Sequence, residues 1–177
     1  VPPTNTGFLS PSANTAVTSQ SGDNNGYEVS SSNGMANDGF FAVDNNSGTN
    51  TNTSCANRSK DRHIYYNYNI SLPGSAVING IEVRLDARAD STTGAPKLCV
   101  EISWNGGTSW TAVKQTPTLT TSEATYILGG PTDTWGRFWA TGELTNANFR
   151  IRIVDVASNS SRDFSLDWVA VNIYYQP

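Results

Sequence analysis

Oxygen-bearing side chains gather in one short stretch of the sequence, where they could bind a hard cation. Asp38, Asp44 and Asn46 lie within residues 37–48, together with further Asn, Ser and Gly residues. Calcium takes about six to eight oxygen ligands from carboxylates, amide side chains and backbone carbonyls. The stretch therefore predicts a calcium site, with calcium as the one cofactor indicated. The alternative is the ordinary turn chemistry of Asp and Asn.

Asp167 is the fourth predicted calcium ligand. It is in phase with Val169 and Val171 on one face of an apolar run, so its carboxylate should be drawn partly inward. A buried carboxylate needs a partner. The candidates are a cation, an arginine such as Arg162, or backbone N–H groups.

Aromatic side chains suggest a different kind of site, for carbohydrate. Trp135 and Trp139 lie in a Gly-flanked segment, and Tyr65 is expected to face outward on its strand. Exposed rings beside hydrogen-bonding groups can bind sugars. The alternative is that these rings fill the core, which is the commoner use of tryptophan in a small domain.

Catalytic constellations are not found in the sequence. A glycosidase needs two opposed carboxylates, but most Asp and Glu residues fall in turns or at solvent-facing strand positions. His63, the only histidine, is expected on the surface at the start of a strand, and no motif exposes a serine nucleophile beside it. The sequence therefore predicts a protein that is not an enzyme.

The composition sets the class of protein. The chain has 177 residues, of which 15% are charged, and a net charge of −4. This size suits one domain, and the absence of a basic excess argues against nucleic acid as a partner. No apolar run approaches the ~18 residues of a membrane span.

The two cysteines bear on the compartment. Cys55 and Cys99 are 44 residues apart, Cys55 in a polar loop and Cys99 in an apolar strand, which suits a disulfide that ties the loop to a sheet; two unrelated buried thiols are the alternative. An even cysteine count and low charge favour an extracellular or cell-surface location. The start at Val1, without a signal segment, is expected of a mature chain.

The elements that must position these residues are strands. Apolar and polar residues alternate in four segments, 63–70, 78–88, 98–104 and 149–153. A fifth segment, 164–175, is apolar on both faces and is expected to be a central strand. No helical period is sustained. The pattern predicts an all-β fold, a sandwich of two antiparallel sheets with jelly-roll or immunoglobulin-like topology. Residues 1–25 are expected to form an extended arm or edge strand, and residues 26–177 the sandwich.

Several motifs add resemblances to this pattern. The run from Ser103 to Trp110 resembles a degenerate Asp-box, which implies a hairpin covered by Trp110. Stretches such as NGMANDGFFAVD, GGPTDTWGRFW and SLDWVAVNIYY resemble a recurrent, uncharacterised β-sandwich domain of bacterial and archaeal secreted and surface proteins. The Asp167-Trp168-Val169 run is loosely similar to jelly-roll carbohydrate-binding modules. The recurrent domain implies no particular activity.

Two functions are consistent with these features. The first is a structural subunit of a cell-surface assembly, a pilus-like filament or surface layer, in which the N-terminal arm adds a strand to another copy of the chain. The alternative is a carbohydrate-binding or adhesive module of a secreted protein, whose partner would be a polysaccharide.

Overall fold

The computed structural model describes residues 4–47 and 53–177, and strands dominate them. The strands are β1 Thr4–Asn5, β2 Ala13–Ala16, β3 Ala42–Asp44, β4 Arg62–Tyr66, β5 Val77–Ala89, β6 Lys97–Ser103, β7 Lys114–Gln115, β8 Ala124–Gly129, β9 Arg150–Val156 and β10 Phe164–Gln176. Two short 3₁₀ helices, η1 Ser31–Gly34 and η2 Thr141–Glu143, interrupt the connections. Within the described residues no helix is long and apolar enough to span a membrane.

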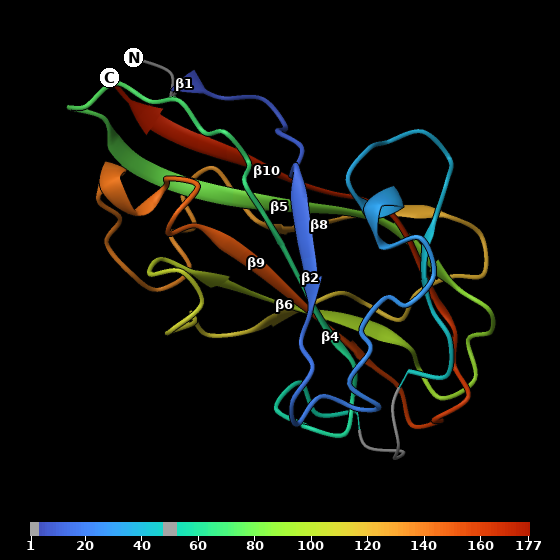
Figure 1. Cartoon of the computed structure of the whole chain (residues 1–177). Coiled ribbons are helices and arrows are strands. Elements are labelled where there is room, and N and C mark those ends of the chain that lie inside the picture. The colour runs from blue at the N-terminus through green and yellow to red at the C-terminus, as the bar shows by residue number, and fades with distance from the viewer. Residues whose placement is uncertain (1–3, 48–52) are drawn as a thin grey trace.

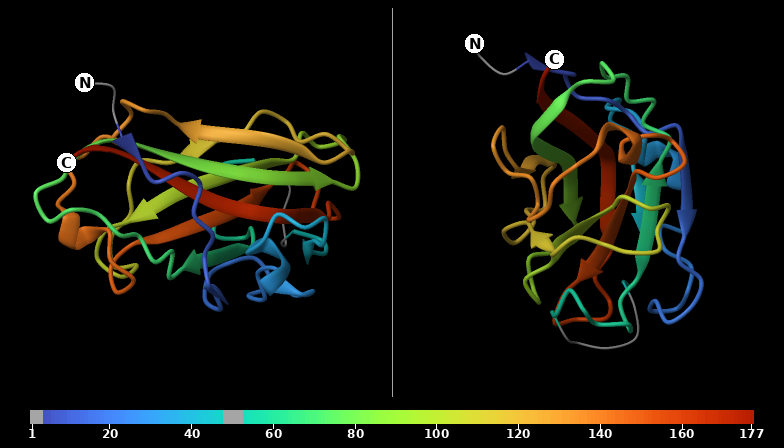
Figure 2. Two further views of the ribbon diagram at one scale, coloured as in Figure 1. Left: turned by 90° about the horizontal axis from the view of Figure 1, so that it is seen from above. Right: turned by 90° about the vertical axis from the view of Figure 1, so that its left-hand side faces the viewer.

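The strands form two antiparallel sheets packed face to face (Figures 1 and 2). Sheet A has the order β1-β10-β5-β8, and β3 also pairs with β10; sheet B has the order β2-β4-β9-β6-β7. The sets β3-β10-β5-β8 and β4-β9-β6-β7 are the two four-stranded halves of a jelly roll. The predicted two-sheet β-sandwich is confirmed, and the strand order selects the jelly roll.

The core lies between the two sheets, where alternation predicted it. In β5 the side chains of Ile81, Val83 and Leu85 are fully buried. Leu98, Val100 and Ile102 of β6 and Ile151 and Ile153 of β9 are buried in the same way from the opposite sheet. Because successive strand side chains point to opposite faces, the intervening residues of β6 and β9 project from the outer face of sheet B.

Strand β4 departs from its predicted orientation. His63 and Tyr65 were expected to face solvent, but their exposed fractions are 2% and 0%, while Ile64 and Tyr66 lie half-buried on the outer face. The reason is that the alternation does not continue through residues 63–70. The strand ends at Tyr66, and Asn67 and Asn69 have positive φ values of 58° and 53°. These left-handed residues reset the phase, so that Tyr68 is buried as predicted although Tyr66 is not.

The N-terminal segment runs along the edges of both sheets of its own chain. Thr4–Asn5 pairs with β10, and Ala13–Ala16 pairs with β4. Between these strands, Leu9 forms a backbone bridge to Val171. In Figure 1, β1 accordingly lies beside the C-terminal end of β10.

The Asp-box-like segment forms the expected turn after β6. The N–H of Gly107 donates to Oγ of Ser103 at 2.8 Å, and the N–H of Ser109 donates to Oδ1 of Asn105 at 2.8 Å. Ser103 also bridges to Trp110. This turn places Trp110 on the outer face of sheet B, beside β9.

Candidate functional site

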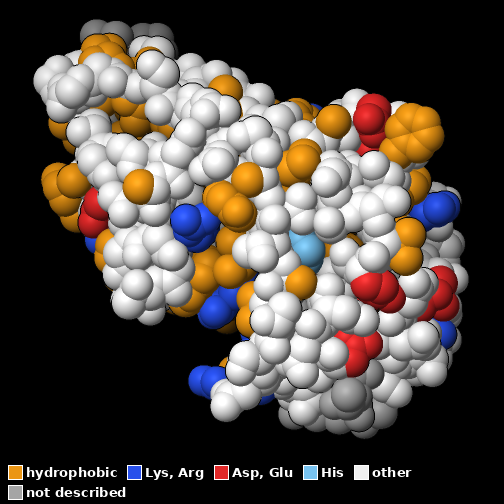
Figure 3. Space-filling model, in the orientation of Figure 1, with side chains coloured by type: hydrophobic (Ala, Val, Ile, Leu, Met, Phe, Trp, Pro, Cys, Tyr) orange, Lys and Arg blue, Asp and Glu red, His pale blue; other side chains and the backbone are white. Residues whose placement is uncertain are grey.

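A cavity of about 290 Å³ opens on the outer face of sheet B. Its lining is mostly polar and comprises Val17, Ser19, Gln20, Cys55, Ala56, Arg58, Arg62, Glu101 and Arg152. We call it the basic cavity, because three of its side chains are arginines and one is a carboxylate. In Figure 3, basic side chains line the hollowed lower left of the molecule, over the position of β9 and β6 in Figure 1.

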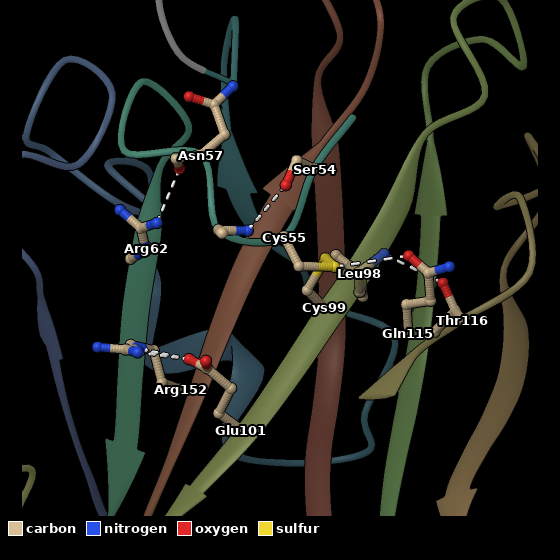
Figure 4. The surroundings of a disulfide bond; sticks show 11 residues. Ser54, Cys55, Asn57, Arg62, Leu98, Cys99, Glu101, Gln115, Thr116 and Arg152 are labelled. Atoms are coloured by element: carbon tan, nitrogen blue, oxygen red, sulfur yellow. Dashed lines mark hydrogen bonds and ion pairs between the residues drawn. A yellow bond between two sulfur atoms is a disulfide. The ribbon is translucent and has the colours of Figure 1, made fainter. Parts of the chain in front are cut away.

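Arg62 fastens two loops together at one wall of the cavity. Its Nη1 donates to the carbonyl of Gln20 at 2.9 Å. Its Nη2 donates to the carbonyl of Asn57 at 2.7 Å, as Figure 4 shows. Burial lowers the pKa of Arg62, and the positive charge of Arg152 lowers it further. Arginine nevertheless stays charged in proteins, so Arg62 is a cation held in place beside two others.

Arg152 and Glu101 form the floor of the cavity. They lie opposite each other on β9 and β6, and Nε of Arg152 donates to Oε2 of Glu101 at 2.7 Å (Figure 4). The Arg152 guanidinium also lies 4.1 Å from the centroid of the Trp110 ring. Stacked and ion-paired, this guanidinium has a fixed orientation.

The same arrangement continues along β9 beyond the cavity. The guanidinium of Arg150 lies 4.3 Å from the centroid of the Tyr66 ring. Arg150 and Arg152 thus both project outward on one strand, each over an aromatic ring. The rings support arginines here, so the outer face of sheet B presents flat guanidinium groups.

A disulfide closes one side of the cavity. Cys55 is bonded to Cys99 of β6, as predicted, with a Cα–Cα distance of 5.7 Å. Cys99 is fully buried and packs with Val154 and Val156 of β9, whereas Cys55 is part of the cavity wall. The bond ties the loop that carries Asn57 and Arg58 to sheet B (Figure 4).

The aromatic residues predicted to bind carbohydrate are not exposed. Tyr65, Trp135 and Trp139 have exposed fractions of 0%, 3% and 2%. Each polar ring atom is paired with a backbone carbonyl, Tyr65 with Ser31 at 2.9 Å, Trp135 with Ile81 at 2.9 Å and Trp139 with Thr134 at 2.8 Å. They are core side chains with satisfied polar groups, so they offer no ring face to a sugar in this structure.

The structure does not gather the side chains of the four predicted calcium ligands into one site. Asp167 is buried and accepts the backbone N–H groups of Asp38 and Gly39 at 3.2 and 3.0 Å, one of the three partners considered for it. Asp38 and Asn46 are exposed. Asp44 is buried beside Asp155 instead. In residues 4–47 and 53–177, no three His, Cys, Asp or Glu side chains are arranged to hold a metal ion.

Sequence reasoning missed Arg58, Arg62, Arg152 and Glu101. The outward phase of Arg152 on its strand was visible in the alternation. The order of the strands was not, so nothing in the sequence placed residue 152 beside residues 58 and 62. Arg58, Arg62 and Arg152 carry the same positive charge in a chain whose net charge is −4. That charge is the one signal in the sequence that could have drawn attention to these arginines.

Comparison with known proteins gives structural neighbours only. No family model matches the chain, and no curated protein matches its sequence. Among solved structures, a truncated AlyQ with CBM32 and alginate lyase domains has 15% identity and a TM-score of 0.45 over 99% of this chain. This chain spans 35% of that AlyQ chain.

Two further neighbours are single modules. The CBM32 of AlyQ in complex with 4,5-unsaturated mannuronic acid has 16% identity and a TM-score of 0.42, covering 93% of this chain and 96% of that one. A CBM4 structure has 14% identity and a TM-score of 0.43, covering 77% of this chain and 71% of that one. By their names, both neighbours are carbohydrate-binding modules.

Proposed function

We propose that this chain is a non-catalytic, extracellular carbohydrate-binding module that binds an acidic polysaccharide in the basic cavity. The observation that carries this function is the convergence of Arg58, Arg62 and Arg152 on one cavity of an acidic protein. Only one carboxylate, Glu101, lines the cavity to offset them. A planar guanidinium can bind a carboxylate through two parallel hydrogen bonds, which suits a uronic acid.

The remaining lining suits the hydroxyl groups of a sugar. Ser19 supplies a hydroxyl, Gln20 an amide and Glu101 a carboxylate, so donors and acceptors are both present. The cavity volume is at the small end of ligand sites, which fits one sugar unit. Arg150, further along β9, could hold the next acidic unit of a chain.

The same lining supports a non-catalytic role. A glycosidase places two carboxyl groups on opposite sides of the bond that it cleaves. In the basic cavity the described lining includes Glu101 alone, and that carboxylate is ion-paired with Arg152. The disulfide supports an extracellular location, because such bonds persist in oxidising compartments.

The filament-subunit hypothesis depended on a free N-terminal arm. The described part of that arm, from residue 4 to residue 16, is paired with β10 and β4 of its own chain. It therefore has no unpaired strand of its own to add to a neighbouring subunit's sheet. The carbohydrate-binding alternative is the function that the geometry favours.

Affinity electrophoresis tests the proposal. The protein is run in gels that contain polygalacturonate, alginate or a neutral glucan, at low and high salt. We expect retardation by the acidic polymers, reduced by salt because the attraction is between charges. Arg58→Ala and Arg152→Gln should each weaken the affinity about tenfold or more, the effect expected of one lost charge-assisted hydrogen bond.

Arg88→Ala is the matched control. Arg88 is an exposed arginine on sheet A and stacks on Phe41 with its guanidinium 4.5 Å from the ring centroid, so its loss removes equal charge far from the cavity. It should leave retardation nearly unchanged. If all three variants lost the same amount of affinity, the retardation would depend on net charge and not on the basic cavity. If only the neutral glucan retarded the protein, an acidic polysaccharide would be excluded as the ligand.

A further inference from the structure

Glu101 is the carboxylate of the basic cavity, and it faces two of the three arginines. It lies on β6 opposite Arg152 of β9. Oε2 of Glu101 accepts the Nε–H of Arg152 at 2.7 Å and lies 2.5 Å from Nη2 of the same guanidinium (Figure 4). Burial and the charge of Arg152 lower the pKa of Arg62, and the charge of Glu101 acts against both. Glu101 therefore influences Arg62 as well as Arg152.

The pair of Glu101 and Arg152 is held in one arrangement. The guanidinium of Arg152 packs on the Trp110 ring, 4.1 Å from its centroid. The exposed fractions are 22% for the Arg152 side chain and 18% for that of Glu101, so water is partly excluded from the pair. Such a pair is stronger than one between fully exposed side chains. Glu101 thus stays in the cavity as a fixed negative charge.

One oxygen of Glu101 remains available to a ligand. Both nitrogens of Arg152 approach Oε2, and in the described part of the chain no hydrogen bond is made to Oε1. Oε1 is not among the buried side-chain atoms that lack a partner, so solvent reaches it. An ionised carboxylate only accepts hydrogen bonds. Oε1 can therefore bind a hydroxyl group but repels another anion.

The opposite side of the cavity is positive. Neither Arg58 nor Arg62 forms an ion pair within the described residues. Arg62 donates to two backbone carbonyls, which are neutral, and Nη1 of Arg58 donates to Oε1 of Gln20. Because Glu101 already balances the charge of Arg152, the unbalanced charges of the cavity lining are those of Arg58 and Arg62.

The width of β9 separates the positive side from the negative one. Sheet B has the order β4-β9-β6, so two strand spacings, at least about 9.5 Å, lie between the backbones of Arg62 and Glu101. The cavity between them has a volume of about 290 Å³. One sugar unit bound across it would direct its carboxylate to Arg58 and Arg62 and its hydroxyl groups to Glu101.

We propose that Glu101 determines specificity in the basic cavity, selecting uronic acids with free hydroxyl groups and rejecting sulfated sugars; this inference rests on the proposed carbohydrate-binding function. A free hydroxyl group donates to Oε1 of Glu101. A sulfate ester at the same position has no hydrogen to donate, and it brings a second negative charge against Glu101. A repulsive element of this kind separates ligands that the attractive contacts alone would not distinguish.

Polygalacturonate and its O-sulfated derivative test this role, because the two polymers share one backbone and the same carboxylates. Affinity electrophoresis at several polymer concentrations gives the affinity for each. The wild-type protein should bind the sulfated polymer about tenfold more weakly, because sulfate and Glu101 carry like charges. Glu101→Gln keeps the size of the side chain and an acceptor for Arg152 but loses the charge. This variant should bind the sulfated polymer at least as tightly as the unsulfated one.

Two further variants separate this role from effects on net charge and on folding. Glu123→Gln removes the same charge at an exposed position just before β8 of sheet A, and Glu101→Asp keeps the charge in the cavity. Both should retain the preference for the unsulfated polymer. Equal binding of the two polymers by the wild type, or an unchanged preference in Glu101→Gln, would overturn the inference and leave the proposed function standing. Binding of neither polymer would refute the proposed function, and the inference with it.

Discussion

At the residue scale, arginine packed on aromatic rings recurs throughout the molecule. The strongest case is Arg137, whose guanidinium lies 3.9 Å from the centroid of Trp104 and 4.6 Å from that of Trp139. Its other partner is Glu143, at 3.0 Å. The ring of Trp139 thus packs against a half-buried ion pair, and the planar guanidinium explains why arginine rather than lysine is favoured in such a stack.

The pair formed by Arg137 and Glu143 predicts a pH dependence. Burial alone would raise the pKa of Glu143, but hydrogen bonds from Arg137 and the N–H of Ala140, with the charge of Arg137, lower it overall. A lowered folded-state pKa means that the pair stabilises the fold above the unfolded-state pKa and loses this effect as the pH falls through the folded-state value.

Thermal unfolding of Glu143→Gln against wild type measures this effect. The variant should melt at a lower temperature at pH 7, and the difference between the two proteins should shrink as the pH falls through the lowered folded-state pKa of Glu143. A difference that stays constant across this range would show that the charge of Glu143 does not contribute.

At the scale of the elements, the disulfide connects stability with the candidate site. The Cys55–Cys99 bond holds the loop of Asn57 and Arg58 against β6. The guanidinium of Arg62 donates to the carbonyl of Asn57, so this loop also holds Arg62 in place. A single covalent bond therefore constrains two of the three arginines of the basic cavity.

Replacing both cysteines by serine should affect stability and binding together. Loss of a bond that closes a 44-residue separation should lower the free energy of unfolding by about 2–4 kcal/mol. The loop would also be less well held, so retardation by polygalacturonate should weaken. Urea unfolding and affinity electrophoresis, with and without reductant, measure both effects, and the double variant should not respond to reductant. Unchanged retardation would show that the loop does not position the site.

Elements with clear alternation could be predicted from the sequence. In β5, β6 and β9 apolar residues alternate with charged or polar ones, and the buried faces are those expected. In β4 histidine and tyrosine can serve either face, and the left-handed Asn67 ends the period, so His63 and Tyr65 were assigned to the wrong side. The Cys55–Cys99 bond was predicted because two cysteines allow one pairing.

The candidate site depends on information that alternation does not contain. Arg152 comes beside Arg62 because β9 pairs with β4, and strand order cannot be read from a period of two. The buried position of Asp44 follows from the pairing of β3 with β10, which places its carboxylate in the core. Long-range pairings therefore limited the prediction of the basic cavity and of the position of Asp44.

At the scale of the whole molecule, charge is distributed unevenly. The chain has 15 acidic and 11 basic residues, yet arginines dominate the basic cavity, and three of the aspartates, Asp44, Asp61 and Asp155, are buried. Within the jelly roll these two groups have different roles. The arginines face an open cavity and can meet a ligand, whereas these aspartates are enclosed.

The most direct test of the account is to locate the bound saccharide by NMR. Backbone amide shifts of the ¹⁵N-labelled protein are followed while a tetramer of galacturonic acid is added. The account predicts saturable changes concentrated in residues 17–20 and 54–62 and on β6 and β9. Changes confined to sheet A, or none at millimolar oligosaccharide, would contradict the assignment of the basic cavity as a site for acidic sugars.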